Sequence, residues 1–277
     1  MGVDWARPEA LWLVSLANSS IELGLVKLAI CCAARQKFSL AGFSEEDLRS
    51  PKNLKNLFEN WAAKHSKNYA SPEEKLRRFE VFRDNVRHIH EGNKEKRSYW
   101  LGLNEFADMS HEEFKGKYLG LKMGRREVVR KSSKSTFIYQ NASFLPKTVD
   151  WRKKGASRVK VVSITGFQDV PENNEESLLK AVAHQPVSVA IEASGSDFQF
   201  YKGGIFDGTC GTDLDHAVTA VGYGSSYAQD YFIIKNSWGA GWGENGYIRM
   251  RRNTGKPEGL CGINKMASYP IKWKLIS

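Results

Sequence analysis

The clearest pattern of hydrophobic and polar positions lies between residues 71 and 94, where steps of three and four trace one helix face. At about 100° per residue, six positions share an arc of roughly 100°: Glu74, Arg78, Phe82, Asn85, Ile89 and Asn93. Ser71 before Pro72 is a typical helix start, because serine can cap backbone amides and proline fits the first turn. Packing against a partner explains Phe82 and Ile89, but explains the polar residues between them less well.

Weaker patterns predict elements on both sides of this helix. Leu57, Trp61 and His65 recur every fourth residue and share a face of an earlier helix, where we interpret His65 as structural. Alternation over residues 99–110 predicts an extended strand with every second residue on one face. These residues are Gly102, Asn104, Phe106 and Asp108. Two later strands and a short helix are predicted at 186–194, 231–239 and 176–185.

Composition indicates a globular protein without a nucleic-acid partner. The 277 residues suffice for one large or two modest domains, and 41% of them are hydrophobic and 26% charged. The net charge is +10, but the basic residues are spread widely, and the densest cluster at 123–134 is typical of a flexible linker. The six histidines show no ligand spacing with Cys or Asp, so we expect no metal and no organic cofactor.

The first 44 residues are interpreted as a degraded or misassigned targeting segment. Two apolar runs, 11–16 and 23–34, are separated by Glu22, and Lys27 interrupts the second run. Neither run is long enough to span a bilayer, so no stable membrane span is expected. The start "MGVDWA" lacks the Ser or Thr of a myristoylation signal.

The four cysteines form two pairs. Cys31 and the cysteine after it lie in an apolar run, whereas Cys210 and Cys261 are 51 residues apart. Together with the sequons at Asn18 and Asn141, the second pair suggests an oxidising compartment and a disulfide. Two unpaired thiols are the alternative that the residues alone leave open.

The two patterns between residues 74 and 108 resemble the two signatures of the papain-family propeptide. Ten positions match at the correct spacing: Glu74, Arg78, Phe82, Asn85, Ile89, Asn93, Gly102, Asn104, Phe106 and Asp108. In that family the module packs on the enzyme and sends its following segment through the cleft, which stays blocked until cleavage. The resemblance is particularly close to plant members of the xylem type. It implies an inhibitory propeptide domain at 45–121 and an activation linker at 122–144.

The second half resembles the peptidase domain of the same family. The stretch "LPKTVDWRKKGA" is similar to the mature amino terminus, which implies a peptidase domain at 145–277. His216 just before a predicted strand and Asn236 at the end of another resemble the catalytic base and the amide that orients it. The resemblance also implies a disulfide between Cys210 and Cys261. It places four further residues in the substrate groove or as support for the site: Asp215, Ala217, Trp238 and Trp242.

The chain lacks a counterpart of the family's nucleophilic cysteine. The family places that residue roughly 130–150 residues before the histidine, but only 71 residues separate Leu145 from His216. No cysteine lies between Cys32 and Cys210. Ser157 and Ser163 are poor substitutes, because a hydroxyl is far harder to ionise than a thiol. Cys31 and Cys32 lie in an apolar context unlike that of a nucleophile.

The resemblance stops near Ala156 and resumes near Val162, which predicts a break at 156/157. The absent part would be most of the left, helical lobe. The implied fold class is therefore α+β, with a helical inhibitory propeptide followed by a truncated papain-like domain that mainly retains the β-rich right lobe.

Three hypotheses follow for function. The chain is an incomplete version of an active cysteine endopeptidase, an inactive isoform whose propeptide inhibits intact relatives, or a product that folds poorly because an apolar face is exposed. Residues 197–208 resemble the loop on which the propeptide docks, so the propeptide can cover part of that face. By family, the expected partners are protein or peptide substrates and intact papain-like proteases. The expected location is the secretory pathway, vacuole or lysosome, or the extracellular space.

Overall fold

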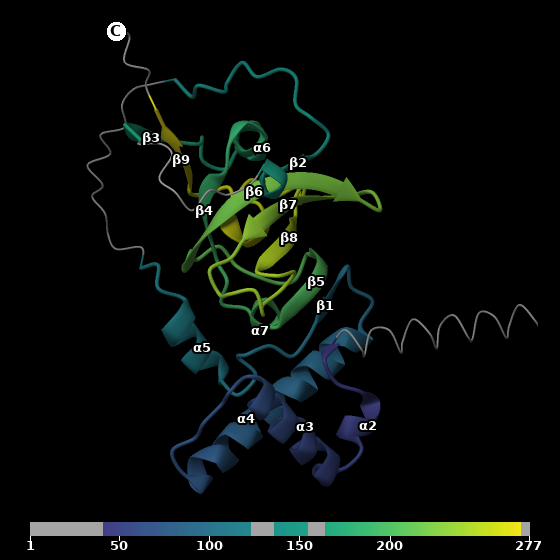
Figure 1. Ribbon diagram of the computed structural model, residues 1–277. Coiled ribbons are helices and arrows are strands. Elements are labelled where there is room, and N and C mark those ends of the chain that lie inside the picture. The colour runs from purple at the N-terminus through teal and green to yellow at the C-terminus, as the bar shows by residue number, and fades with distance from the viewer. Residues whose placement is uncertain (1–40, 123–135, 155–163, 273–277) are drawn as a thin grey trace, which may run out of the picture.

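The computed structural model describes residues 41–122, 136–154 and 164–272 (Figure 1). The break at 156/157 and nearly all of the expected targeting segment lie outside the described residues. We call residues 41–122 the helical module and residues 164–272 the β lobe; Figure 1 shows the module below the lobe. No helix within the described ranges is long and apolar enough to cross a membrane.

Within its described residues, the helical module has helices that each begin after a serine. The serine Oγ accepts a hydrogen bond from the backbone amide three residues later, which satisfies a donor that the helix itself leaves open. The predicted start at Ser71, with Pro72 in the first turn, is confirmed. The helices are α2 (Glu45–Leu48), α3 (Pro51–Lys64), α4 (Pro72–Lys94) and α5 (His111–Tyr118).

Aromatic rings join α3 to α4 in the centre of the module. The ring of Phe82 lies 5.3 Å from that of Phe58 and 5.0 Å from that of Trp61, measured between centroids. Phe82 and Ile89 are 0% exposed, as their positions in the helical pattern predicted. His65 ends α3 and lies beside Trp61, which is a structural position.

The described residues form one nine-stranded sheet, most of whose strands belong to the β lobe, in the order β1-β5-β8-β7-β6-β4-β9-β3 with β2 paired to β6 (Figure 1). β5 and β8 run parallel, and the other pairs are antiparallel. The strands are β1 (Tyr99–Leu101), β2 (Val149–Asp150), β3 (Gly166–Asp169), β4 (Val187–Ile191), β5 (Tyr201–Phe206), β6 (His216–Ser226), β7 (Gln229–Lys235), β8 (Tyr247–Arg251) and β9 (Ala267–Ile271).

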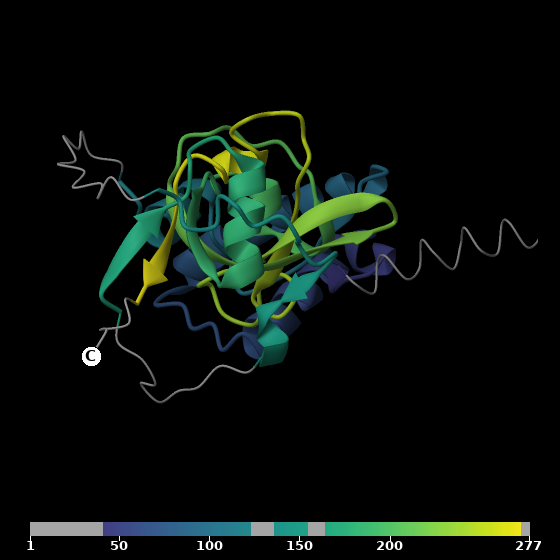
Figure 2. The same ribbon diagram turned by 90° about the horizontal axis from the view of Figure 1, so that it is seen from above.

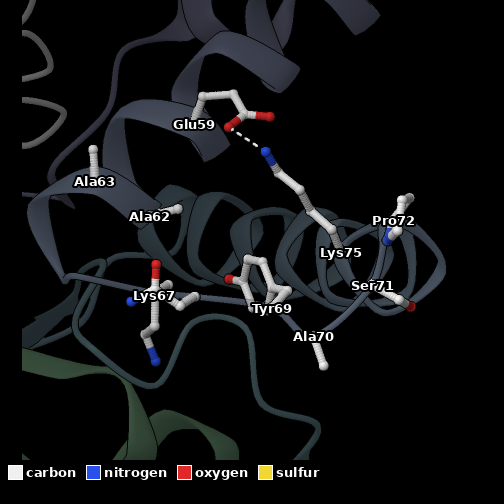
Figure 3. Close-up of a pocket in the computed structure, with 10 residues that line it drawn as sticks. Glu59, Ala62, Ala63, Lys67, Tyr69, Ala70, Ser71, Pro72 and Lys75 are labelled. Atoms are coloured by element: carbon white, nitrogen blue, oxygen red, sulfur yellow. Dashed lines mark hydrogen bonds and ion pairs between the residues drawn. The ribbon is translucent and has the colours of Figure 1, made fainter.

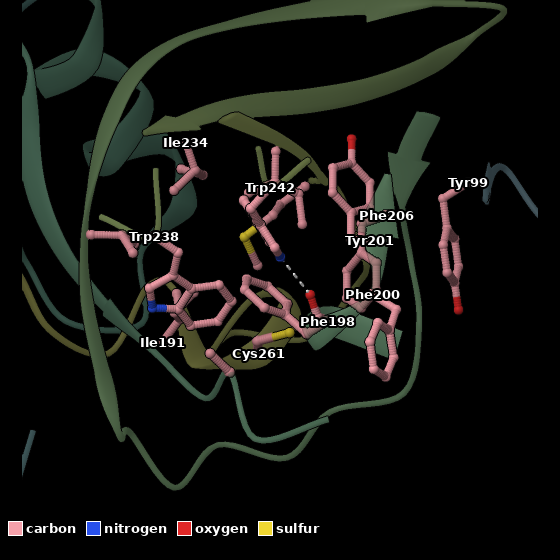
Figure 4. Packing of buried hydrophobic residues seen from close by; sticks show 14 of the residues in the cluster. Tyr99, Ile191, Phe198, Phe200, Tyr201, Phe206, Ile234, Trp238, Trp242 and Cys261 are labelled. Atoms are coloured by element: carbon pink, nitrogen blue, oxygen red, sulfur yellow. Dashed lines mark hydrogen bonds between the residues drawn. The ribbon is translucent and has the colours of Figure 1, made fainter. Parts of the chain in front are cut away.

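Helix α6 (Glu175–His184) lies over the sheet (Figure 2) and buries Leu178, Ala181 and Val182 completely. Elsewhere, large rings fill the centre of the lobe (Figure 4). Trp242 is 0% exposed and donates from its indole N–H to the carbonyl of Phe198 at 3.1 Å. The remaining short elements are η1 (Trp151–Lys154), α7 (Ser196–Gln199) and η2 (Leu260–Gly262). The expected disulfide between Cys210 and Cys261 is confirmed.

The first strand of the sheet comes from the helical module. β1 pairs antiparallel with β5, so Tyr99 lies opposite Gly204. Gly204 has φ +93°, and a Cβ there would lie 2.4 Å from the carbonyl oxygen of Ser98. Only glycine fits both the backbone conformation and this close approach. The module therefore extends the sheet of the lobe by backbone hydrogen bonding.

The expected strand over residues 99–110 is shorter than the alternation suggested. Only Tyr99–Leu101 is extended and paired, and residues 105–108 form a turn. Within that turn the Asn104 side chain accepts from the amide of Phe106 at 3.0 Å, and Met109 donates to the carbonyl of Phe106. The alternation was wrong as a strand signal because side-chain hydrogen bonding to nearby amides takes the place of a partner strand.

At the opposite edge of the sheet, no strand of the described residues pairs with the outer side of β3. β3 is the last strand in the order, and Phe167 within it is 68% exposed. Ile164, just before β3, is 63% exposed. An exposed apolar edge strand can pair with another chain. This feature is separate from the exposed apolar face of the third hypothesis.

Candidate active site

His216 and Asn236 come together although they are 20 residues apart in the sequence. His216 is the first residue of β6 and Asn236 directly follows β7, and these two strands pair antiparallel. His216 Nε2 lies 2.9 Å from Asn236 Oδ1. Because an amide oxygen can only accept, Nε2 carries the proton in neutral His216, and Nδ1 keeps a lone pair. The geometry thus leaves Nδ1 as a base.

Trp238 covers this pair. Its ring stacks on that of His216 with centroids 4.8 Å apart and planes at 27°. Trp238 is 5% exposed because aromatic rings of the helical module pack around it. Their centroids lie 6.2, 4.9 and 6.5 Å from that of Trp238, for Phe106, Phe114 and Tyr118 respectively. The sequence pattern singled out Phe106 but gave no signal for the other two.

Burial controls the protonation of His216. Removal from water lowers the pKa of His216 below its usual value of 6.5, and the hydrogen bond to Asn236 and the charge of Asp215 oppose this only in part. For Asp215, burial raises the pKa, and the backbone N–H of Ala193, which donates at 2.8 Å, lowers it. His216 is therefore neutral at pH 7, as a base must be.

Replacing Asn236 with alanine is expected to lower the pKa of His216 further, since the lost hydrogen bond favoured the charged ring. An NMR titration of the ring protons measures this, with Asn68→Ala at an exposed position of the module as control. Because the folded-state pKa is below the unfolded one, folding stability from this group falls as the pH drops through 6.5. An unchanged or raised midpoint in the Asn236 variant would contradict the assignment.

The other predicted site residues occupy different surroundings. Trp242 lies beneath Trp238, with ring centroids 5.1 Å apart, and supports it from within the core. Ala217 is exposed and pairs with Ala190 of β4. As the neighbour of His216 on one strand, Ala217 faces the other side of the sheet. Its place in a substrate groove remains a prediction.

The segment after α5 reaches the site. The backbone N–H of Leu121 donates to the carbonyl of Asp215 at 3.0 Å, one residue from His216. Glu105 of the module lies over Gly241, where a Cβ would be 2.3 Å from the Glu105 carboxylate. The module therefore approaches the His216 region from two sides, as the resemblance implies for an inhibitory propeptide.

No described side chain supplies a thiol to His216. The two cysteines among the described residues are Cys210 and Cys261, and they are bonded to each other. Cys31 and Cys32 lie outside the described residues, as do Ser157 and Ser163. Nor do the described ranges contain a group of three or more His, Cys, Asp or Glu side chains suited to a metal ion.

The polar residues of the α4 motif hold the second motif in place. Asn85 donates to the carbonyls of Ala107 and Met109, both at 2.9 Å, and Asn93 exchanges two hydrogen bonds with the backbone of Leu101. These hydrogen bonds satisfy backbone groups at the end of β1 and in the chain after it, where the pairing with β5 ends. The polar residues on this face of α4 thus bind the backbone of the second motif within the module.

Charged residues of the two motifs form a second set of contacts. Arg78 donates to both carboxylate oxygens of Glu113 at 2.9 and 2.8 Å and to the carbonyl of Asp108 at 3.1 Å. The Asp108 carboxylate accepts from Lys67 at 2.9 Å and from Tyr69 at 3.0 Å. Glu74, the first residue of the α4 motif, accepts a hydrogen bond from the amide of Ala70 at 2.9 Å.

Besides Phe106, whose ring packs on Trp238, two motif residues form hydrogen bonds to the lobe. The Gly102 amide donates to the carbonyl of Phe200 at 2.9 Å, and the Asn104 side chain donates to that of Gln199 at 2.8 Å. The ten motif positions therefore have two structural roles: they stabilise the interior of the module and they attach the module to α7 and β5 of the lobe.

Asp197 of α7 is the charged centre of that attachment. Its carboxylate accepts from Tyr99 at 2.6 Å, lies 2.9 Å from His88 Nε2 and pairs with Arg97. Burial raises the pKa of Asp197, but the hydrogen bonds from His88 and Tyr99 and the charge of Arg97 outweigh it and hold the pKa at about 2. Only the loop around Asp197 could be predicted, because no pattern in a single sequence pairs residue 97 with residue 197.

The attachment of the helical module to the β lobe through Asp197 is expected to weaken in acid. A depressed pKa adds stability that is present above the usual 3.8 and is lost as the pH falls toward about 2. Hydrogen exchange between pH 4 and 2 should show loss of protection in β1 relative to β7. In an Asp197→Asn variant, the protection of β1 should be low throughout and independent of pH; a pH dependence equal to that of the original chain would refute this account.

A surface hollow of about 570 Å³ lies within the module and away from His216 (Figure 3). Two of its lysines are already paired, Lys75 with Glu59 at 2.7 Å and Lys67 with Asp108 at 2.9 Å. The hollow therefore has no converging unpaired charge, and we assign it no role.

Comparison with known proteins identifies the class. The profile of papain family cysteine proteases matches residues 126–271, and that of the cathepsin propeptide inhibitor domain matches residues 58–114. The structure is similar to the proform of the ragweed pollen cysteine protease Amb a 11, with a TM-score of 0.75, 30% identity and coverage of 84% of this chain and 99% of that one. A recombinant stem bromelain precursor gives a TM-score of 0.68 at 31% identity, covering 78% and 98%. The fold is that of a cysteine protease proform.

Curated relatives agree. Cysteine protease XCP2 of Arabidopsis thaliana is 45% identical, with 92% of this chain and 97% of that protein covered, and papain of Carica papaya is 38% identical, with 85% and 92% covered. The chain belongs to the papain family of cysteine proteases, with an inhibitory propeptide ahead of the peptidase domain. The alignment with the Arabidopsis protein spans 347 positions, 70 more than the 277 residues of this chain. That relative therefore has at least 70 residues without a counterpart here.

Proposed function

We propose that this chain is a papain-type proform that keeps the general base His216 and the orienting amide Asn236 but has no nucleophile, so that it does not hydrolyse peptides. The observation that carries the proposal is that the cysteines in the described part of the β lobe, Cys210 and Cys261, bond to each other. No further cysteine follows Cys32 before Cys210. A thiolate is the nucleophile in this chemistry, and a base alone cannot replace it.

An internal gap accounts for the missing group. The relative's residues without a counterpart here support a break at 156/157 that removed the segment carrying the nucleophile. We accordingly divide the chain into a targeting segment (1–44), an inhibitory propeptide (45–121), a linker (122–144) and a truncated peptidase domain (145–277). Entry into the secretory pathway, on the way to a vacuole or the outside of the cell, is supported by the disulfide.

Activity of the purified chain tests the proposal. The full chain, before and after acid treatment, is incubated with a fluorogenic peptide amide, and papain serves as the positive control. We expect no hydrolysis above the background of a His216→Ala variant. Hydrolysis that exceeds this background and is abolished by a thiol alkylator would overturn the proposal, because it would require a reactive cysteine.

The second candidate function is inhibition of intact papain-family proteases by the propeptide. It is favoured by the complete set of motif contacts, which fold the module around its own core. In this chain, however, β1 occupies the edge of β5 and Asp197 binds Arg97 and Tyr99. The module must leave its own lobe before it can bind another enzyme, so the intact chain should inhibit weakly.

Replacing Asp197 with alanine is therefore expected to strengthen inhibition in trans severalfold. The change weakens the attachment in cis but leaves every residue of the helical module intact. Inhibition of papain at increasing concentrations of the full chain measures it, with Asp207→Ala, which removes a partner of Arg251 on the same lobe, as the matched control. Arg97→Ala should not strengthen inhibition, because it alters the module itself. If neither the original chain nor the Asp197 variant inhibits, the module is not a trans inhibitor.

A further inference from the structure

Residues 136–140, here called the anchored segment, lie on the β lobe ahead of the expected mature start. The ring of Tyr139 stacks on that of His184 with centroids 4.3 Å apart, and Phe137 meets Tyr269 at 6.2 Å. Tyr139 also lies 5.3 Å from Tyr269. Both aromatic side chains therefore contact the lobe, although the backbone here is a turn in which the amide of Gln140 donates to the carbonyl of Phe137 at 3.0 Å.

Hydrogen bonds fix the same segment. The Gln168 side chain donates to the carbonyl of Thr136 at 3.1 Å and accepts from the amide of Ile138 at 3.3 Å. Gln185 donates to the hydroxyl of Tyr139 at 3.2 Å. The anchored segment therefore has a defined position on α6, β3 and β9 through side chains that the papain-like site does not use.

Beyond Tyr139 the chain turns outward into the sequon Asn141-Ala142-Ser143. The amide of Ala142 donates to the carbonyl of Tyr139 at 3.0 Å, and Asn141 and Ser143 are both exposed. The Asn141 side chain has no hydrogen-bond partner among the described residues. Phe144, the next residue, is 88% exposed, which is unusual for so large an apolar side chain.

We propose that Asn141 is an N-glycosylation site, and that its glycan shields the chain between the anchored segment and Leu145 from cleavage. An Asn-x-Ser sequence with x other than proline is the acceptor pattern for this modification in secreted proteins. The disulfide of the β lobe indicates passage through the oxidising compartment in which the transfer occurs. The other sequon, at Asn18, lies outside the described residues and supplies no comparable geometry.

The chemistry requires a lipid-linked oligosaccharide as donor. A bond forms between Nδ2 of Asn141 and C1 of the first sugar, while the bond from that C1 to the lipid pyrophosphate breaks. One amide proton passes to a base of the transferase, and no oxidant or reductant is involved. The folded chain accepts the product without rearrangement, because Asn141 is exposed and has no hydrogen-bond partner to lose among the described residues.

The glycan has a physical consequence at this place. An N-linked glycan is bulky and solubilising, so it would cover the exposed ring of Phe144. Exposed turns with small polar residues are preferred sites of proteolytic cleavage. The turn at 138–141 and the exposed residues directly after it form such a site. Occupied by sugar, it would be closed to a processing protease. This shielding role rests on the proposed domain boundary at residue 145, whereas the modification itself does not.

Peptide mapping tests the modification. The full chain is expressed in a eukaryotic secretory host behind a heterologous signal peptide, and molecules with the Cys210–Cys261 disulfide are selected as correctly delivered. We expect sugar on Asn141, complete loss in Ser143→Ala, and retention in Ser143→Thr, which keeps the hydroxyl that the acceptor pattern needs. Asn18→Gln is the matched control and should leave the Asn141 glycan unchanged. Unmodified Asn141 in disulfide-bonded molecules would overturn the proposal.

Limited proteolysis tests the shielding. Disulfide-bonded chains with the original sequence, Ser143→Ala or Ser143→Thr are exposed to an added protease of broad specificity, and cleavage between residues 136 and 145 is followed by mass spectrometry. We expect severalfold faster cleavage in Ser143→Ala than in the other two. Equal rates would refute the shielding role. Neither outcome depends on whether the chain itself hydrolyses peptides, so failure here and failure of the proposed function are distinguishable.

Discussion

Replacing both Cys210 and Cys261 with alanine is expected to lower the free energy of unfolding of the β lobe by about 4 kcal/mol. The disulfide closes a loop of 51 residues that contains β6, β7 and β8. Cross-linking of so long a loop restricts the unfolded chain more than it restricts the folded one. A loss of that size is a large share of the stability of a typical domain.

Urea unfolding of the double variant and of the original chain measures the difference, followed by tryptophan fluorescence. Reduction of the original chain provides the control: it should reproduce the loss, whereas the double variant should not respond to reductant. A decrease in the free energy of unfolding of less than about 1 kcal/mol would contradict this expectation. It would mean that residual structure restrains the loop in the unfolded state, or that the disulfide is strained in the folded state.

Replacing Phe82 with alanine is expected to destabilise the helical module by roughly 3–5 kcal/mol. Phe82 is 0% exposed and contacts the rings of Phe58 and Trp61, so its loss leaves a cavity between α3 and α4. The backbone hydrogen bonds made by Asn85 and Asn93 depend on the same helix face. We therefore expect the whole module to loosen, and its attachment to β5 with it.

Hydrogen exchange localises this effect. Amides of α3, α4 and β1 should lose protection, while those of β6 and β7 should keep most of theirs. Leu76→Ala is the matched control on the same helix, because Leu76 is 60% exposed and its truncation should change stability by less than about 0.5 kcal/mol. Equal effects of the two variants, or uniform loss of protection across both parts, would show that Phe82 is not the centre of an independent module core.

The long helix could be predicted because its signals are local. Ser71 and Pro72 mark its start and the repeat of Phe82 and Ile89 marks its buried face, and the structure confirms both. What the repeat could not give is the partner of the polar residues. Asn85 binds backbone groups 22 and 24 residues away, and such distances along the chain leave no trace in a helical period.

The strand at 99–110 shows the opposite case, in which a local signal was misleading. The alternating residues do make contacts there, but Asn104 accepts from the nearby amide of Phe106, and Asp108 accepts from the distant side chain of Tyr69. Alternation alone cannot distinguish a face of a strand from a series of separate contacts. A strand also needs a neighbour, and the pairing with β5 ends at Leu101.

The pairing of His216 with Asn236 could be predicted only in part. The placement of both residues at strand ends was predictable, and their closeness followed only from the family resemblance, because register between β6 and β7 decides it. Phe114 and Tyr118 were missed altogether, and Asp197 was predicted only as part of the docking loop at 197–208. Their partners lie in the other part of the chain, and a single sequence contains no signal that joins the two parts.

The strand that the helical module contributes to the sheet also bears on the order of assembly during synthesis. Contacts inside the module join residues from 8 to 62 positions apart, whereas the hydrogen bonds of Asn104 and Arg97 to the lobe span 95 and 100. Shorter loops close sooner and with less entropy lost, and chains emerge from the ribosome amino terminus first. The module can therefore be complete while β5 is still being translated. β5 then emerges beside a preformed β1, and the nascent lobe spends little time with that edge open to neighbouring chains.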